Sequence, residues 1–269
     1  MALRHKLSML IKNQKTTYII SFPKCGRTWL RMMLGYTIAR QLNISFSSPS
    51  ELLELKTLRK RNACVPKILI KHDDEPFWKK PGELETDKGI FKRDQVVFLV
   101  RDPRDVLISS YFEKTRRDFV YRNQKKYEGT LSQYVNESVG GFETLLAYYN
   151  IWFENRNIPR KMLLVRYEDM HASPERELGR VLQFVGIKNV HDSLITGAVV
   201  FSSFDNMKKM EAIGSGSWRL SPADRNDPES YKARKGKVGG YRDYLDEQQI
   251  EHLTCLMNKK LSPWFNYKF

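Results

Sequence analysis

The sequence has little of what marks secreted, membrane-spanning or metal-binding proteins. Its three cysteines, Cys25, Cys64 and Cys255, are widely spaced and odd in number. They form neither a disulfide framework nor a metal-binding pattern, which suits a reducing compartment. No apolar run approaches the roughly 18 residues of a membrane-spanning helix. These absences predict a cytoplasmic protein with no transmembrane segment and no metal site.

The first 15 residues also lack the features of a secretory signal. They contain no long apolar region and no small-residue cleavage site. Apolar residues do recur there at helical spacing among basic ones, at Leu3, Leu7, Leu10 and Ile11. We expect a short N-terminal helix that docks before the first strand. A helix that touches a membrane or targets an organelle is the alternative.

Acidic residues are fewer than basic ones. The chain has 46 lysines and arginines against 31 aspartates and glutamates, a net charge of +15. Such a charge predicts an anionic partner, and nucleic acid, a membrane surface and a multiply phosphorylated small molecule all qualify. No zinc-finger spacing and no aromatic RNA-binding motif is present, so we expect no nucleic-acid partner.

Short apolar runs alternate with amphipathic segments along the chain. Four runs read as buried parallel strands, at residues 18–22, 67–71, 96–100 and 162–166. Helices are expected after three of them, at residues 28–40, at 106–114, and from Pro174 to a stop at Gly186. This alternation predicts an α/β fold, with a central parallel sheet flanked by helices. No composition break divides the 269 residues, so we expect a single domain.

One long segment is mostly polar. Residues 205–237 contain the stretches GSGSW, SPADRNDPES and KARKGK and few apolar side chains. Polar segments of this length inside a compact domain are usually lids, binding loops or disorder. We expect a mobile lid that orders over bound ligand.

The stretch SFPKCGRTW, residues 21–29, joins the first strand to the first helix. It is not a Walker A loop, because Lys24 precedes Gly26 instead of following the last glycine. It nevertheless predicts a P-loop-like anion site. Cys25 within it could be a nucleophile, but no partner histidine stands in the motif, which favours a small residue that fits a tight loop.

The residue types in this loop suit an anionic ligand. A helix that begins near Thr28 presents free N–H groups and the positive end of its dipole. Gly26 lets the backbone approach an anion, while Lys24 and Arg27 add positive charge. Trp29 could stack on a base. The alternative is a capped helix with a core tryptophan.

A second stretch, residues 97–112, also suggests a phosphate site. Arg101 stands at the carboxyl end of a strand, where α/β sheets bind ligands, and arginine can grip phosphate with two parallel hydrogen bonds. Ser109 lies about two helical turns further on and could donate to the same anion. The alternative is a salt-bridged turn built with Asp102 and Asp105.

Together, the two stretches resemble the two phosphosulfate-binding signatures of the sulfotransferase family. That family uses 3'-phosphoadenosine 5'-phosphosulfate (PAPS) as its donor. Its first signature reads approximately Y-P-K-S-G-T-T-W, and residues 22–29 match it, with Phe22 in place of the similar tyrosine, except at Cys25 and Arg27. Its second signature has an arginine and a serine eight residues apart, matched by Arg101 and Ser109.

Three further motifs resemble the same family in its order. RYEDM follows the fourth strand and makes Tyr167 the candidate for contacting adenine. SSFDNM resembles [ST]-S-F-x-x-M and brings Ser202 and Phe204 near adenine. RKGKVGGY resembles the family's R-K-G motif at the donor's 3'-phosphate, through Arg234, Lys235 and Gly236. The match covers the chain from about residue 17 to residue 245.

The resemblance implies roles for these motifs. The first loop, including Lys24, Cys25, Gly26, Arg27, Thr28 and Trp29, would hold the 5'-phosphosulfate end of the donor. The 3'-phosphate would be held by Arg101, Ser109, Arg234, Lys235 and Gly236. The product would be adenosine 3',5'-bisphosphate (PAP). The dimer motif of animal cytosolic members is absent after Tyr241, which leaves the oligomeric state open.

The resemblance also implies a catalytic base. His72 follows the second strand, where the family has the histidine of K-T-H, and would take the acceptor's proton. Lys24 would neutralise the bridging oxygen, and Ser109 would tether Lys24 between turnovers. Asp73 and Asp74 would orient His72 or form a solvated turn, with a carboxylate site as the alternative.

Three matters stay open in the sequence. A P-loop nucleotide or small-molecule kinase is one rival interpretation, and a non-catalytic basic polyanion-binding protein is the other. The acceptor is the third matter. Four aromatic residues hint at a pocket for a phenol or other apolar alcohol, or else belong to the core: Phe22, Phe77, Trp78 and Phe142.

Overall fold

A computed structural model describes residues 15–117, 125–214 and 218–267. The helix expected at the N-terminus therefore lies outside the described residues, apart from Lys15. So do residues 215–217 of the polar segment. Within the described ranges, no helix has the length and apolar character needed to cross a membrane.

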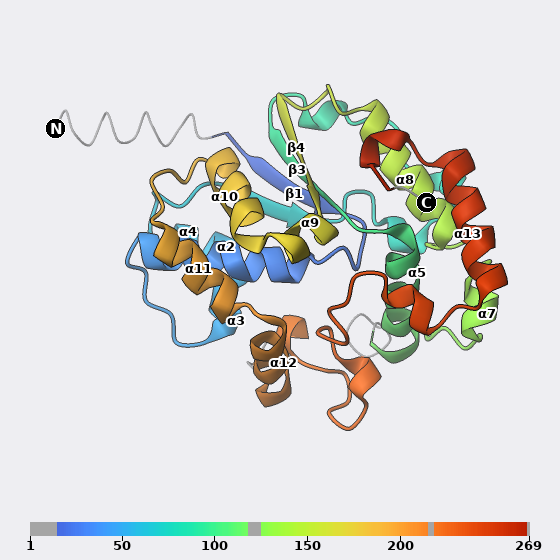
Figure 1. Ribbon diagram of the computed structural model, residues 1–269. Helices are drawn as coiled ribbons and strands as arrows, with labels where there is room; N and C mark the ends of the chain where they lie inside the picture. Colours follow the sequence, from blue (N-terminus) through green and yellow to red (C-terminus); the bar gives the residue numbers. More distant parts are fainter. Residues whose placement is uncertain (1–14, 118–124, 215–217, 268–269) are drawn as a thin grey trace.

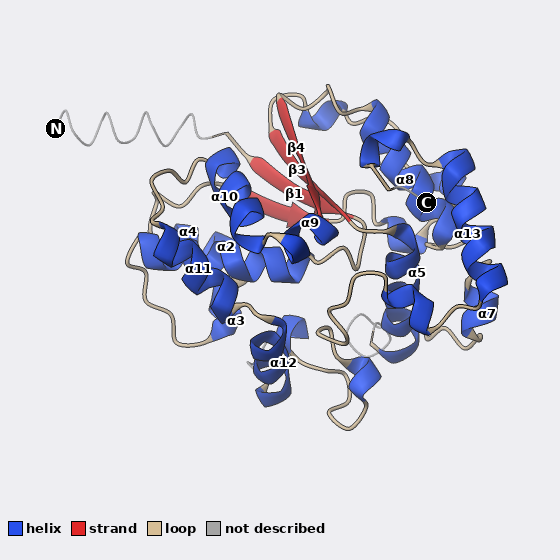
Figure 2. Ribbon diagram, viewed as in Figure 1, coloured by secondary structure: helices blue, strands red, loops and turns tan. Residues whose placement is uncertain are grey.

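Four parallel strands form the centre of the fold, in the order β2-β1-β3-β4 (Figure 2). They are β1 (Thr17–Ser21), β2 (Ile68–Lys71), β3 (Gln95–Val100) and β4 (Lys161–Arg166). Each lies within one residue of its predicted range, so all four predictions are confirmed. Because the strands run parallel, their carboxyl ends meet at one edge of the sheet, where ligands bind in such folds.

Helices cover both sides of this sheet, which confirms the predicted α/β fold (Figure 1). One side carries α2 (Arg27–Gln41), α3 (Pro49–Leu52), α4 (Leu55–Arg61), α9 (Tyr167–Ala172), α10 (Pro174–Val185) and α11 (Asp192–Phe201). The other carries α5 (Pro103–Arg116), α7 (Leu131–Tyr134), α8 (Phe142–Glu154) and α13 (Glu247–Lys260). Short 3-10 turns connect them, at η1 (Pro76–Trp78), η2 (Pro81–Glu83), η3 (Gly89–Phe91), η4 (Trp218–Leu220), η5 (Pro228–Ser230), η6 (Gly240–Asp243) and η7 (Pro263–Phe265).

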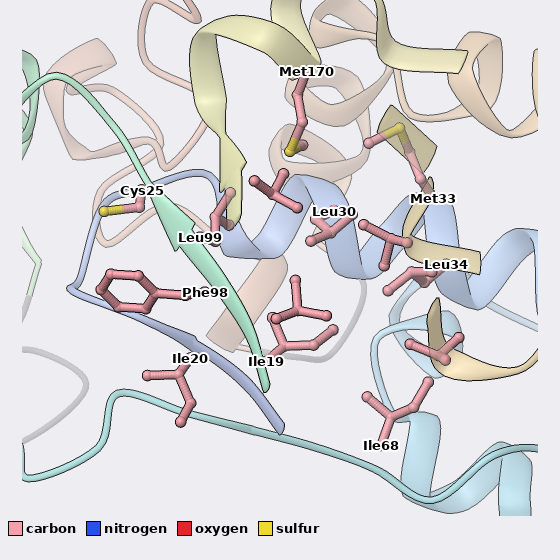
Figure 3. Packing of buried hydrophobic residues seen from close by; sticks show 14 of the residues in the cluster. Ile19, Ile20, Cys25, Leu30, Met33, Leu34, Ile68, Phe98, Leu99 and Met170 are labelled. Carbon is pink, nitrogen blue, oxygen red and sulfur yellow. The ribbon is translucent and has the colours of Figure 1, made fainter. Parts of the chain in front are cut away.

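The core lies between the sheet and these two helical layers. Alternate strand residues point to opposite faces, so Ile20 and Phe98 lie on one side while Leu99 lies toward Leu30 of α2 (Figure 3). On the first side, the Phe98 ring stacks on Trp152 of α8, with ring centroids 5.4 Å apart. Both strand faces are thus buried, which explains why β1 and β3 read as continuous apolar runs.

The sequence predicted α2, α5 and α10 but not the other described α-helices, and two of those show why. The sequence of α8 is apolar nearly all round, so it lacks the polar face that marks a surface helix. The helix α12 (Phe204–Ile213) lies within the segment expected to be a loop. Ser203 caps it by accepting a hydrogen bond from the Asn206 N–H at 3.4 Å. The predicted start and stop of α10 are observed, but the Ser173 side chain makes no capping hydrogen bond.

Candidate active site

One pocket of about 360 Å³ opens at the carboxyl edge of the sheet. His72, Arg101 and Tyr167 line it, and each is the first residue after a strand, β2, β3 and β4 respectively. All of the predicted site residues except Cys25 line this pocket: Lys24, Gly26, Arg27, Thr28, Trp29, His72, Arg101, Ser109, Tyr167, Ser202, Phe204, Arg234, Lys235 and Gly236. Residues spread over more than 200 positions therefore face one space.

The loop after β1 has the geometry of an anion site. Lys24 and Gly26 both adopt left-handed backbone conformations, with φ of 71° and 88°. Left-handed residues in such a loop turn backbone N–H groups toward a common point. The helix α2 then begins at Arg27 with no acidic residue in its first turn. Its positive dipole end is therefore not neutralised locally.

Gly26 allows this loop to pack against Tyr167 of the RYEDM motif. A Cβ atom there would lie 2.5 Å from the Tyr167 ring, so only glycine lets the ring rest on the loop. Trp29 meets the same ring edge-on, with centroids 5.8 Å apart. The first and third motifs are thus packed together although about 140 residues separate them.

The SSFDNM and RKGKVGGY motifs pack against each other in the same way. Gly236 is left-handed, with φ of 60°, and a Cβ atom there would lie 2.4 Å from the Phe204 ring. Ser202, just before α12, is fully buried and lines the same pocket. Two rings, Tyr167 and Phe204, are therefore each held against a glycine of another motif.

Cations gather around this part of the pocket. The Arg101 guanidinium donates to the Ser109 hydroxyl at 3.3 Å and lies over the Tyr167 ring at 4.3 Å. Arg234 pairs with Glu229 at 3.0 Å, and Lys235 pairs with Asp243 at 3.2 Å. An incoming phosphate would compete with these acidic partners for the two cations.

Cys25 is the exception among the predicted residues. Its side chain is fully buried in the core and lies 3.3 Å from the Tyr149 hydroxyl (Figure 3). Burial raises the pKa of this thiol to about 12. A buried, protonated thiol is a poor nucleophile. The residue is therefore a small core side chain, and only its backbone can face a ligand in the loop.

His72 is held in one tautomer. Its Nδ1 atom lies 2.9 Å from the Ser21 carbonyl oxygen, which can only accept, so Nδ1 carries the hydrogen. The neutral ring then has its lone pair on Nε2, which lies 2.5 Å from Nη2 of Arg27. Tyr148 further fixes the backbone by donating to the His72 carbonyl. The ring is thus oriented with its basic nitrogen toward Arg27.

The two acids after His72 are engaged with lysines. Asp73 is buried and pairs with Lys88 at 2.9 Å, and Asp74 pairs with Lys79. Both aspartates have left-handed backbones, which this pairing holds. Of the two roles expected for these acids, the solvated turn is not observed, because the turn is ion-paired, and the orientation of His72 stays a prediction. Among the described residues, no three His, Cys, Asp or Glu side chains are grouped for a metal ion.

Lys24 has a different partner from the predicted one. Its ammonium pairs with Glu113 of α5, whereas Ser109 bonds to Arg101. Burial alone would raise the pKa of Glu113, but Lys24 and Arg117 together hold that pKa well below its usual range. The carboxylate is therefore ionised, and the predicted Ser109 tether is replaced by an ion pair with Glu113.

This pair belongs to a charged network that the sequence analysis missed. Arg117 lies 3.4 Å from Glu113 and 3.2 Å from Glu211 of α12. Glu211 in turn accepts the backbone N–H groups of Lys232 and Ala233 at 2.7 and 2.9 Å. Burial, followed by the charges of Arg117 and Lys24, lowers the pKa of Lys232 to about 7 against the partial opposition of the two carboxylates. The network joins α5, α12 and the chain before Arg234.

A signal for half of this network was present in the sequence. Polar residues recur every four positions along and just after α5, at Asp105, Ser109, Glu113 and Arg117. Residues four apart share a helix face, and Ser109, Glu113 and Arg117 of this stripe line the pocket. No comparable pattern marks Glu211 or Lys232, which reach the site only through the path of the chain after α11.

Of the four aromatic residues considered for an acceptor pocket, one lines the pocket and the other three do not. Phe77 lines the pocket. Phe22 and Phe142 are buried in the core, and Trp78 packs against it. Phe77 is itself almost fully buried in the core, so the alternative assignment of these four residues to the core is the one that the structure favours.

Comparison with known proteins decides the family. A family profile described as "Sulfotransferase domain" matches residues 14–265. The chain belongs to the sulfotransferase family. This confirms the resemblance and the predicted enzyme class, and it removes the support for a kinase or a non-catalytic polyanion binder. The family supports sulfuryl transfer from PAPS, while the roles of single residues stay predictions.

This sulfotransferase is similar to enzymes from plants and animals. It is 26% identical to cytosolic sulfotransferase 17 of Arabidopsis thaliana, over 90% of this chain and 73% of that one. It is 24% identical to flavonol 3-sulfotransferase of Flaveria bidentis, over 91% and 81% of the two chains. Mouse sulfotransferase 1A1 is also 24% identical, over 88% and 81%.

Solved structures share the fold of this sulfotransferase. Mouse sulfotransferase SULT7A1, complexed with PAP, superposes with a TM-score of 0.62 at 19% identity, covering 92% of this chain and 85% of that one. Retinol dehydratase in a complex with retinol and PAP gives a TM-score of 0.62 at 18% identity, covering 92% and 81%. These similarities support the fold described above.

Proposed function

We propose that this sulfotransferase moves the sulfuryl group of PAPS to a hydroxyl or amine of a small molecule, with His72 as general base. One observation carries the proposal. Three residues that directly follow strands, His72, Arg101 and Tyr167, face one pocket beside a left-handed anion loop. Sulfuryl transfer from PAPS needs a base, a cation that binds phosphate and an aromatic surface for adenine close together, and these three residue types provide them.

The donor would bind across both ends of the pocket. The left-handed loop and the start of α2 suit the 5'-phosphosulfate, because they offer N–H groups and a positive dipole end. The ring surfaces of Trp29, Tyr167 and Phe204 suit adenine. The 3'-phosphate would lie with Arg101, Ser109, Arg234, Lys235 and Gly236. The close packing of Gly26 and Gly236 against aromatic rings supports the fit.

The transfer itself needs one group that takes the proton of the acceptor and another that stabilises the negative charge on the leaving oxygen. The acceptor oxygen forms a bond to sulfur while its proton passes to Nε2 of His72, the nitrogen that the Ser21 contact leaves as the lone pair. The bond between sulfur and the bridging oxygen breaks, and its electron pair stays on that oxygen. Lys24 would leave Glu113 to stabilise this negative charge. No step is assigned to a metal ion.

The acceptor and the location are proposed from the names of similar proteins. The names of two relatives specify flavonols, which are phenols, and a third is named a cytosolic enzyme. We therefore propose a phenol or another small alcohol as acceptor and a cytoplasmic location.

The lid also stays a proposal. We propose that residues 205–237 order over the acceptor when the donor is bound and so exclude water. Glu211 ties α12 to the chain at Lys232 and Ala233, so the two ends of the segment would move as one unit. Hydrogen exchange with and without PAP tests this. Equal exchange of the described part of the segment in both states would refute it.

Donor binding is the direct test of the function. PAP at about 100 times its dissociation constant should raise the free energy of unfolding by about 2.7 kcal/mol. ATP should stabilise less, because it lacks a 3'-phosphate. Equal stabilisation by ATP would show that the 3'-phosphate site is misassigned. A screen of phenols and alcohols with labelled PAPS, read by mass spectrometry, would then identify the acceptor.

A further inference from the structure

The basic nitrogen of His72 is covered by Arg27. The two atoms, Nε2 of the ring and Nη2 of the guanidinium, lie 2.5 Å apart. Since Nδ1 carries the hydrogen that faces the Ser21 carbonyl, Nε2 must be the acceptor of a hydrogen bond from Arg27. A lone pair engaged in this way cannot take a proton from an acceptor molecule. In this structure the proposed base is therefore blocked.

Arg27 is placed to respond to the donor. It is the first residue of α2 and lines the same pocket as the anion loop. Guanidinium groups bind phosphate and sulfate oxygens through hydrogen bonds that are often bidentate and in which both partners are charged. A neutral imidazole offers a single acceptor. An anionic group in the loop should therefore draw Arg27 away from His72.

We propose that Arg27 couples donor binding to the release of the base. Without donor, Arg27 occupies Nε2 of His72. With the 5'-phosphosulfate bound, the guanidinium turns to its oxygens and leaves the lone pair open to the acceptor's proton. Arg27 is thus a positioning residue that imposes an order, donor first and productive acceptor second. The inference rests on the proposed role of His72 as base.

The contact can be followed without knowing the acceptor. In the intact protein, long-range ¹H–¹⁵N spectra report the hydrogen bonding of each imidazole nitrogen, and a His72→Gln variant assigns the signals. PAP should shift the Nε2 resonance of His72 in the wild-type protein. Binding of PAP is verified separately by calorimetry. If PAP binds and the Nε2 resonance stays in place, the coupling is wrong while the proposed function stands; if PAP fails to bind, the proposed function itself is wrong.

Substitution of Arg27 provides a second test of the contact between Arg27 and His72. Arg27→Thr removes the guanidinium and introduces the residue type that the family signature has at this position. Its ligand-free Nε2 resonance should already lie near that of the PAP-bound wild type. Diethyl pyrocarbonate, which attacks an open imidazole nitrogen, should modify His72 about tenfold faster, the scale of one lost hydrogen bond to a charged group. An unchanged resonance and an unchanged rate in Arg27→Thr would overturn the inference.

A matched control separates this contact from a general loss of charge. Arg31 lies one turn further along α2, lines the same pocket and pairs with Glu54 at 3.2 Å rather than with His72. Arg31→Gln should leave both the Nε2 resonance and the modification rate of His72 at their wild-type values. Equal effects of Arg31→Gln and Arg27→Thr would show that only net charge matters, which contradicts the proposal.

Discussion

The two walls of the pocket are built in different ways. The strand-end wall consists of residues 22–29 and the residues that follow β2, β3 and β4. Left-handed backbones and a glycine packed against the Tyr167 ring fix it. The lid wall consists of α12 and residues 228–237. Arg117 fixes that wall by pairing with both Glu113 and Glu211, and Glu211 also accepts a hydrogen bond from the Lys232 backbone N–H.

The difference has consequences for how each wall responds to its surroundings. Backbone geometry and ring packing do not depend on protonation. Buried ion pairs depend on every partner staying charged, and the loss of one partner strands the others in a medium that solvates charge poorly. We therefore expect the strand-end wall to fail through steric changes and the lid wall to fail through changes of charge.

Breaking the charge network should give the largest effect. Arg117→Met leaves the carboxylates of Glu113 and Glu211 without a buried cation that both contact. The free energy of unfolding, measured with urea, should fall by about 3–5 kcal/mol, the range found when one partner of a buried pair is removed. Adding Glu211→Gln should recover part of the loss, because the stranded charge of Glu211 is then gone while Glu113 still pairs with Lys24. Wild-type stability in Arg117→Met would mean that the network does not hold the lid wall.

Removing the proposed base, His72, should give the next largest effect, and this effect falls on the strand-end wall. His72→Ala should lower turnover about a hundredfold or more, the usual scale for a lost general base. The affinity for PAP, measured by calorimetry, should stay near the wild-type value. His252→Ala on α13, where the side chain is exposed, is the control. Near-normal turnover in His72→Ala would remove this residue from the catalytic role.

Steric change should affect donor binding more moderately. Gly26→Ala places a Cβ atom 2.5 Å from the Tyr167 ring at a φ of 88°. The strain of a left-handed alanine is about 1–3 kcal/mol, so PAP affinity should fall by roughly tenfold or more. Gly82→Ala is the matched control, because a Cβ atom there meets nothing within 4 Å. Equal PAP affinities in the two variants would contradict the packing of the loop against Tyr167.

Titration of Lys232 should give the smallest effect and should be confined to the lid wall. Its pKa is lowered from the ordinary 10.5 to about 7 in the folded chain, so between these values the unfolded chain binds more protons. Stability should therefore rise as the pH increases from about 7 toward 10. Lys232→Met should flatten this rise in urea midpoints measured across that range. A wild-type slope in Lys232→Met would assign the rise to other groups.

Much of this site could be predicted because each of its motifs is a contiguous stretch of the chain. Each donor motif is a short run of residues whose types suit one task, such as Lys24 and Gly26 in the loop or Arg101 after a strand. The parallel topology then guarantees that strand ends meet at one edge. Knowledge of the strands was therefore enough to expect these motifs to face each other.

The pairing of charges could not be predicted in this way. Arg117 and Glu211 are separated by 94 positions, and the stripe on α5 does not specify which residue will face it. The same holds for Arg27, whose contact with His72 depends on how α2 leaves the loop relative to the end of β2. Sequence spacing defines faces of single elements, but not which faces meet.

The sequence by itself determined the α/β fold, the positions of the four strands and a set of residues that the fold brings to one pocket. It could do so because apolar periodicity and short motifs are local properties. Only the tertiary structure decided that Lys24 pairs with Glu113, that Arg27 covers His72 and that Cys25 lies in the core. These outcomes depend on distances between elements far apart in the chain, and packing of the whole fold fixes those distances.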